Sequence, residues 1–71
     1  MNKLKIEIYT TTWNEEFQLP FAIDYWKRFI TDETDFHVFV YDNMSTDNTL
    51  KILSQYPWIT IYQFDTKRPH E

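Results

Sequence analysis

The chain has 71 residues, 20% of them aromatic, with no cysteine, no glycine and a formal net charge of −4. A chain of this length forms one domain at most, and a domain of about 60 residues buries only about 60% of the surface of its unfolded chain. The acidic balance argues against a nucleic acid partner, which needs clustered Lys and Arg.

The lack of cysteine excludes disulfides, and no Cys/His cluster has zinc spacing. The sequence has no apolar run of about 18 residues, so it predicts no membrane span. The N-terminus lacks the apolar region of a signal peptide and the cysteine-free chain suits a reducing compartment, so we expect a cytoplasmic protein.

The first predicted elements are a strand and a helix. Apolar and polar residues alternate from Leu4 to Ile8, which is the period of a strand, and β-prone residues continue to Trp13. The apolar residues that follow have helical spacing and form one stripe: Leu19, Ala22, Ile23, Trp26, Phe29 and Ile30. With Pro20 in its first turn, this helix is predicted to begin at about residues 17–19 and to end near Ile30.

The rest of the chain predicts a strand, a short helix and a third strand. Segment 36–41 is almost continuously apolar, as expected of a parallel strand covered on both faces. After a polar turn, Ser45 is predicted to cap a second helix that has Asp47 in its first turn. Pro57 ends that helix, and segment 58–64 forms the third strand.

The resulting β-α-β-α-β order predicts an α/β domain with a parallel sheet, right-handed crossovers and strand order 3-2-1. Ligands of open parallel sheets bind outside the carboxyl ends of the strands, so the polar clusters 10–16 and 42–49 mark the candidate site. The acidic segment 31–35 belongs to the opposite edge and is interpreted as a solvated loop. His37 is interpreted as a strand residue whose ring nitrogen has a partner.

Each candidate residue in the two clusters has a structural alternative. Asp42 could accept a hydrogen bond from a nucleobase or ribose, or it could close its own Asx-turn. Trp13 could stack on a base, although a place in the core is favoured. Glu15 and Glu16 are interpreted as carboxylates that complement the helix dipole rather than as general bases. In the absence of glycine, the residues expected at positive φ are Asn14, Asn43 and Asn48.

Two motifs resemble those of family-2-like glycosyltransferases with the GT-A fold. The run Thr11-Thr12-Trp13-Asn14-Glu15-Glu16 resembles the T-x-Y-N-E element after their first strand. The run Val40-Tyr41-Asp42-Asn43-Met44-Ser45-Thr46-Asp47-Asn48-Thr49 resembles their V-V-D-D-G-S-T-D-G-T element after the second strand. The resemblance covers about residues 4–65. It implies that residues 1–71 form the N-terminal nucleotide-binding segment, a partial Rossmann-like half, of a glycosyltransferase.

The resemblance also implies a donor site for a nucleotide-sugar, with a UDP-sugar as the commonest donor. Thr11 and Trp13 would line the nucleobase pocket, Glu15 would lie near the base or ribose, and Asp42 would bind the ring N–H. Ser45 and Asp47 would shape the turn. The residues that would reach the diphosphate, by position only, are Lys67 or Arg68.

The chain departs from the family pattern in two ways. Met44 and Asn48 stand where glycines are usual, and Asn43 replaces an aspartate. Because Met44 has a side chain where the family has glycine, it implies a differently shaped loop. The D-x-D element that binds a divalent cation (Mg²⁺ or Mn²⁺) and the catalytic base both follow a further strand in this family, and neither is present here. We therefore expect a fragment that binds no metal and is inactive alone, from a parent enzyme of the hexosyltransferase type.

Two other functional classes remain open. A small stand-alone interaction module without a nucleotide ligand would expose an aromatic patch at Trp58, Tyr62 and Phe64. A receiver-like or flavodoxin-like domain is disfavoured because no acidic pair follows the first strand, and only Asp65 keeps it open. For the fragment expected from the resemblance, the 3-2-1 sheet leaves the first strand as an edge, where the family continues with another strand. We therefore expect a dimer or swapped assembly that pairs across residues 3–9.

Overall fold

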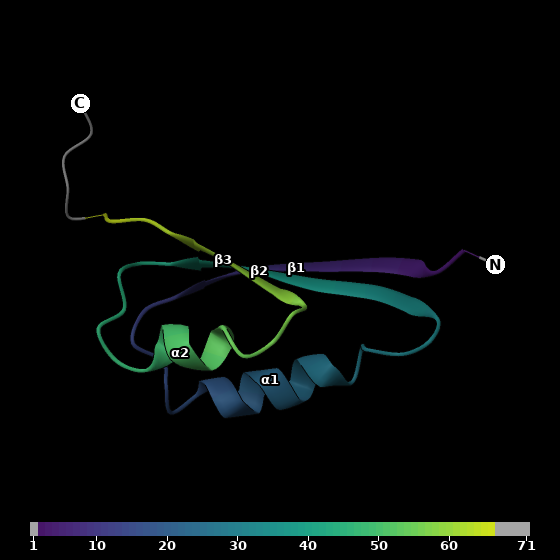
Figure 1. Cartoon of the computed structure of the whole chain (residues 1–71), viewed down its shortest axis with the longest axis horizontal. Coiled ribbons are helices and arrows are strands. Elements are labelled where there is room, and N and C mark those ends of the chain that lie inside the picture. Colours follow the sequence, from purple (N-terminus) through teal and green to yellow (C-terminus); the bar gives the residue numbers. More distant parts are fainter. Residues whose placement is uncertain (1, 67–71) are drawn as a thin grey trace.

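A computed structural model describes residues 2–66 as a single sheet with two helices (Figure 1). In chain order the elements are β1 (Leu4–Thr12), α1 (Leu19–Lys27), β2 (Thr34–Asp42), α2 (Thr49–Leu53) and β3 (Ile59–Gln63). The three strands are parallel in the order β1-β2-β3, with β2 in the centre. The predicted α/β class, element order and sheet topology are therefore confirmed.

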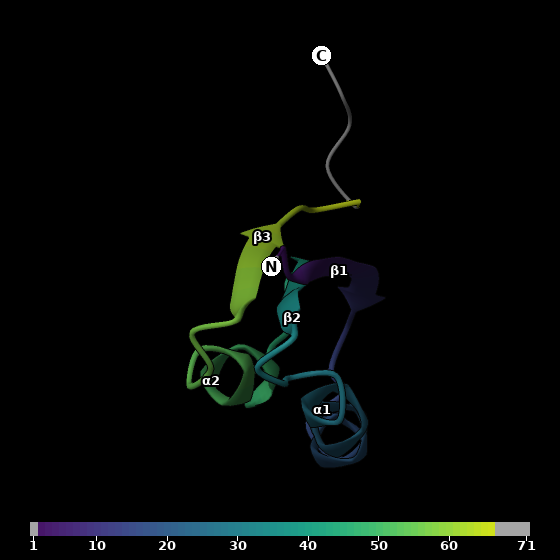
Figure 2. The ribbon, with the colours of Figure 1, turned by 90° about the vertical axis from the view of Figure 1, so that its right-hand side faces the viewer.

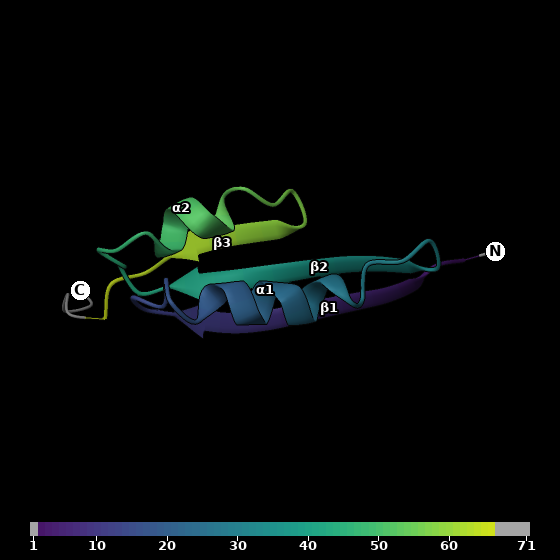
Figure 3. The same cartoon turned by 90° about the horizontal axis from the view of Figure 1, so that it is seen from below.

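Both helices lie on the same face of the sheet (Figure 2). In the view from the helix side, α1 lies across β1 and β2, and α2 lies at the β3 side of the sheet (Figure 3). None of the helices within residues 2–66 has the length and apolar character needed to cross a bilayer.

The prediction that β2 is covered on both faces is wrong. Phe36, Val38 and Val40 are buried beneath the helices, whereas Phe39 is half-buried and Tyr41 is exposed. Successive side chains of a strand point to opposite faces, so alternate residues of this apolar segment lie on the face without helices. The continuous apolar run reflects an aromatic open face rather than a second covering layer.

Two helix boundaries differ from the predictions. α1 has Pro20 in its first turn as predicted, but it ends at Lys27, before Ile30. The N–H groups of Phe29 and Ile30 donate to carbonyls three residues back, so the chain tightens there, and Ile30 is 44% exposed. α2 begins at Thr49, which leaves Ser45 too far upstream to cap it.

The core lies between the sheet and the two helices. Its buried apolar side chains are Leu19, Ile23, Trp26, Phe36, Val38, Val40, Leu53 and Ile59. Trp58 packs against this cluster, with its ring 6.4 Å from that of Trp26 in an edge-to-face arrangement. Trp58 therefore does not belong to an exposed patch, which corrects the prediction, whereas Tyr62 and Phe64 are exposed as predicted.

Candidate functional site

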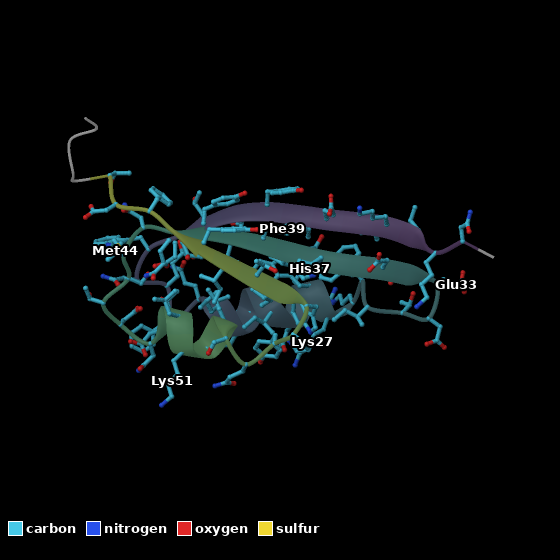
Figure 4. The ribbon with its side chains drawn as sticks, turned by 45° about the horizontal axis from the view of Figure 1, so that its top comes forward. Lys27, Glu33, His37, Phe39, Met44 and Lys51 are labelled. Carbon is cyan, nitrogen blue, oxygen red and sulfur yellow. The ribbon has the colours of Figure 1, made fainter. Side chains whose placement is uncertain are left out.

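The loops that follow β1 and β2 meet at the carboxyl edge of the sheet. Thr12 and Asp42 are register partners at the ends of the two strands. The Asn43 N–H continues the pairing by donating to the Thr12 carbonyl at 2.9 Å, and the Phe64 N–H donates to the Asp42 carbonyl at 2.9 Å. The two polar clusters predicted to mark the site are thus adjacent, at the opposite end of the sheet from Glu33 (Figure 4).

The centre of this contact is the carboxylate of Asp42, a fully buried residue. Its Oδ1 accepts hydrogen bonds from the hydroxyls of Thr12 at 2.7 Å and Ser45 at 2.6 Å, and its Oδ2 accepts one from the Ser45 N–H at 2.8 Å. The bond from the Ser45 N–H, three residues downstream, closes the loop that follows β2, so the structural alternative, in which the Asp42 side chain closes its own loop, is confirmed. Three donors offset the cost of burying a carboxylate away from water.

Asn14 connects the first loop to the second. Its backbone has φ 47°, which confirms its predicted left-handed conformation. The Oδ1 atom of Asn14 accepts hydrogen bonds from the N–H of Thr46 at 2.7 Å and of Asp47 at 3.4 Å, and the Asn14 N–H donates to Ser45 Oγ at 2.9 Å. The side chain and the backbone N–H of Asn14 thereby form the first link between the two loops.

The prediction of a positive φ at Asn43 and Asn48 is wrong. Among the described residues, Asn43 and Asn48 have negative φ, and the second left-handed residue is Met44, with φ 51°. Met44 occupies a position where the family that the sequence resembles has glycine. Met44 lies within the turn closed by the bond from the Ser45 N–H to Asp42, and it adopts the left-handed conformation there despite its Cβ.

Asp47 and Thr49 form a second link between the loops. Asp47 Oδ1 accepts hydrogen bonds from the N–H and the hydroxyl of Thr49, and its Oδ2 accepts one from the Glu16 N–H at 3.2 Å. Thr49 Oγ1 in turn accepts from the Glu15 N–H at 2.8 Å. Desolvation raises the pKa of Asp47, but the hydrogen bonds from Thr49 and Glu16 outweigh it and hold this pKa below its ordinary value.

Two predictions about acidic residues near helix starts are corrected. Neither α1 nor α2 has an acidic residue in its first turn. Glu15 and Glu16 precede α1, where their N–H groups bind the second loop, and Asp47 precedes Asn48, the N-cap of α2. These residues join the loops instead of complementing a helix dipole from within the first turn.

The four residues predicted to contact a nucleotide do not line one pocket. Thr11 and Asp42 lie on opposite faces of the sheet, since Asp42 shares its face with Thr12. Trp13 is 55% exposed, so the favoured assignment of Trp13 to the core is wrong. Glu15 is half-buried. Two shallow depressions on the described surface are lined by other residues, as described below.

The remaining candidates lie where the sequence predicted or outside the described residues. His37 Nε2 is 2.6 Å from Thr60 Oγ1, so the ring nitrogen has a partner. Asp32 and Glu33 line a shallow depression at the amino end of the sheet, away from the loops. Within residues 2–66 no three His, Asp or Glu side chains gather into a possible metal site. The two proposed diphosphate contacts lie outside the described residues: Lys67 and Arg68.

Sequence reasoning missed Thr12 and Thr49 as parts of the site. Both residues are buried, and their hydroxyls donate hydrogen bonds to Asp42 at the end of β2 and to Asp47 in the second loop. A signal was available for Thr12, because the first and second strands end at this residue and at Asp42. No protein-family model, no curated protein and no solved structure matches this chain, so the resemblance to glycosyltransferases rests on the two motifs alone.

Proposed function

We propose that this chain is the nucleotide-sugar donor-binding portion of a glycosyltransferase, with a UDP-sugar as the donor. The observation that supports this most strongly is the pair of interlocked loops at the carboxyl edge of a parallel sheet. Ligands of open α/β sheets bind outside this edge. The same two loops carry the two motifs that resemble the transferase family.

In this proposal the buried and the exposed residues have different tasks. Asp42, with Thr12 and Ser45, holds the loops in position, because its carboxylate already accepts three hydrogen bonds. The exposed indole of Trp13 offers a surface on which a nucleobase stacks. Glu15 supplies a carboxylate that accepts hydrogen bonds from ribose hydroxyls.

The nucleotide contacts of Asp42 and Thr11 that the resemblance implies stay predictions. Asp42 is fully buried behind its three protein donors, so its carboxylate meets a nucleobase N–H only if the loop that covers it moves. Thr11 would contact the nucleotide only from the open face of the sheet.

The proposal assigns sugar transfer itself to other parts of a parent enzyme. The family that the sequence resembles holds Mg²⁺ or Mn²⁺ with a D-x-D element, and residues 1–71 contain no D-x-D motif. The tasks of this chain are to bind and orient the nucleotide, and we expect no transfer by the chain alone. The cytoplasmic location expected from the cysteine-free sequence is part of the same proposal.

Calorimetric titration of the chain with UDP tests this function. We expect saturable binding that Trp13→Ala weakens by about five-fold or more, because stacking of a base on an aromatic ring contributes about 1–3 kcal/mol. The exposure of Trp13 makes the variant compatible with the fold, which far-UV circular dichroism checks. Tyr25→Ala removes a similarly exposed ring from α1 and is the matched control, with unchanged affinity expected.

The alternative, an interaction module without a nucleotide ligand, is favoured by one observation. The open face of the sheet exposes Tyr9, Tyr41, Tyr62 and Phe64. This alternative predicts no heat of binding with UDP for the wild type, and that result would remove the donor-site proposal.

A further inference from the structure

The chain carries two apolar surfaces on opposite sides of the molecule. The first is the open-face patch, on the side of the sheet without helices: Tyr9, Phe39, Tyr41, Tyr62 and Phe64. The second is the α1 stripe, on the outer side of the helix layer: Phe17, Phe21 and Tyr25, which are 86%, 78% and 54% exposed. Figure 2 shows the open face of the sheet on one side and α1 on the other.

The α1 stripe cannot cover the open-face patch of its own chain. Its residues are four apart in sequence, so they lie on one side of the helical path, with Phe17 in the turn that leads into α1. At 100° per residue this side is opposite to that of Leu19, Ile23 and Trp26, which face the sheet. Three large exposed aromatic residues in one row are characteristic of a binding surface rather than of a solvated helix face.

The open-face patch is shaped for side chains of a protein. The rings of Tyr9 and Phe39 stack with centroids 5.0 Å apart, and those of Tyr41 and Tyr62 stack at 5.3 Å. In each pair one face of each ring is turned toward its neighbour, and the Tyr9 hydroxyl donates a hydrogen bond to Glu7 Oε1 at 3.2 Å. A nucleobase or sugar ring stacks on an exposed ring face, whereas ring edges with grooves between them accommodate side chains from a helix.

We propose that the α1 stripe of one copy of this chain packs on the open-face patch of a second copy. This contact completes the helix–sheet–helix layering that parallel sheets almost always have. On its own sheet, α1 lies antiparallel to the strands (Figure 3). If α1 of one copy lies in the same direction on the open face of the second copy, its Phe17 packs over Tyr41 and Tyr62 of that second copy. The span from Phe17 to Arg28 is about 16 Å at 1.5 Å per residue, close to the roughly 20 Å from Tyr41 to Asp35 along β2.

Charge complementarity supports the same orientation. The Arg28 guanidinium lies over the Tyr25 ring at 5.9 Å, so it extends the α1 stripe at its carboxyl end. In the antiparallel arrangement it reaches the amino-end part of the open face. The residues that line a shallow depression there are Lys5, Glu7, Asp35, His37, Phe39 and Thr60. Lys5 forms an ion pair with Glu7 at 3.8 Å, so Asp35 is the carboxylate of this depression that Arg28 meets. Figure 4 shows His37 and Phe39 on the side of the sheet away from Lys27 and Lys51.

This contact uses a different surface on each copy, so it does not close through a two-fold axis. We therefore expect assembly that grows with protein concentration instead of stopping at a dimer. The contact is separate from the proposed donor site, since it involves neither Trp13 nor the loop of Asp42.

Sedimentation velocity on the full chain, from a few to a few hundred micromolar, tests the proposal with two exposed-residue variants. Phe21→Lys disrupts the α1 stripe and leaves the patch intact, and Tyr62→Lys does the reverse on the edge strand β3. We expect the wild type to associate, each variant alone to be monomeric, and an equimolar mixture to form a 1:1 complex through the one intact pair of surfaces. If Tyr62→Lys fails to fold by circular dichroism, Tyr9→Lys replaces it.

Four results would overturn the proposal. If the wild-type chain sediments as a monomer at a few hundred micromolar, the proposed contact between copies does not form. Association that survives both variants indicates pairing across the β1 edge, the mode predicted from the sequence. Association lost only in Phe21→Lys indicates a symmetric helix–helix contact, and association lost only in Tyr62→Lys indicates a symmetric sheet–sheet contact. None of these results changes the UDP titration, so the two proposals fail separately.

Discussion

The Thr12 hydroxyl lies 2.7 Å from Oδ1 of Asp42, and this hydrogen bond joins the last residue of β1 to the last residue of β2. Both residues are buried, and they are register partners in the sheet. The bond therefore fixes the points at which both loops leave the sheet. The geometry of the proposed donor site depends on these two points.

Removal of this bond should destabilise the fold by a measurable amount. Thr12→Val keeps the shape of the side chain and loses the donor, so we expect the free energy of unfolding to fall by about 1 kcal/mol. Asp42→Asn turns an NH₂ group toward groups that are themselves donors, at a cost of about 1–3 kcal/mol. Urea unfolding measures both changes. Thr10→Val, whose hydroxyl has only a 3.4 Å local bond, is the control and should change stability by less than about 0.5 kcal/mol.

The two contributions of Asn14 can be separated by substitution. Asn14→Gly retains access to φ 47° and loses the side-chain bonds to Thr46 and Asp47, for an expected loss of about 1 kcal/mol. Asn14→Ala loses the same bonds and adds the strain of a left-handed Ala, for about 1 kcal/mol more. Equal stability of the two variants in urea would show that the backbone conformation costs nothing at this position.

Met44 and Asn48 should respond in opposite ways to glycine. Met44 has φ 51° without the freedom of glycine, so Met44→Gly should raise the free energy of unfolding by up to about 1 kcal/mol. Asn48 has φ −84° and its side chain donates to Glu16, so Asn48→Gly should lower it by a few tenths of a kcal/mol. Thermal unfolding by circular dichroism compares them. A less stable Met44→Gly variant would show that the Met side chain matters more than the strain.

The lowered pKa of Asp47 predicts a loss of stability in acid. Because the folded pKa is below the unfolded one of about 3.9, the contribution of Asp47 is fully present above that pH. It is lost as pH falls through the folded pKa. We expect Asp47→Asn to show a shallower decline in unfolding free energy below about pH 4 than the wild type. Thr49→Val, which removes one donor to the carboxylate, should move the NMR titration of Asp47 to higher pH, and an unchanged titration would contradict this origin of the shift.

The fold was largely predictable because each element has a clear local pattern. The alternation from Leu4 to Ile8 and the stripe formed by Leu19, Ile23 and Trp26 correctly predict β1 and the buried side of α1. The covering of β2 was not predictable from its own residues. A continuous apolar run is equally compatible with two covering layers and with an exposed aromatic face.

The site was predictable in position but not in detail. The carboxyl-edge rule correctly brings the loops after Thr12 and Asp42 together. The left-handed conformation of Met44 was missed because local propensity favours Asn, whereas the turn closed by Asp42 decides which residue takes that conformation. The exposure of Trp13 was missed because large aromatic residues are more often buried.

The most direct test of the proposed donor site is a ¹H–¹⁵N NMR titration of the chain with UDP, because it reports binding at each backbone amide. We expect concentration-dependent shifts for the amides of residues 11–16 and 43–49, with the amino-end residues Lys5 and Asp35 unaffected. No shifts at millimolar UDP, or shifts confined to the open face around His37 and Phe39, would contradict a nucleotide site at the carboxyl edge.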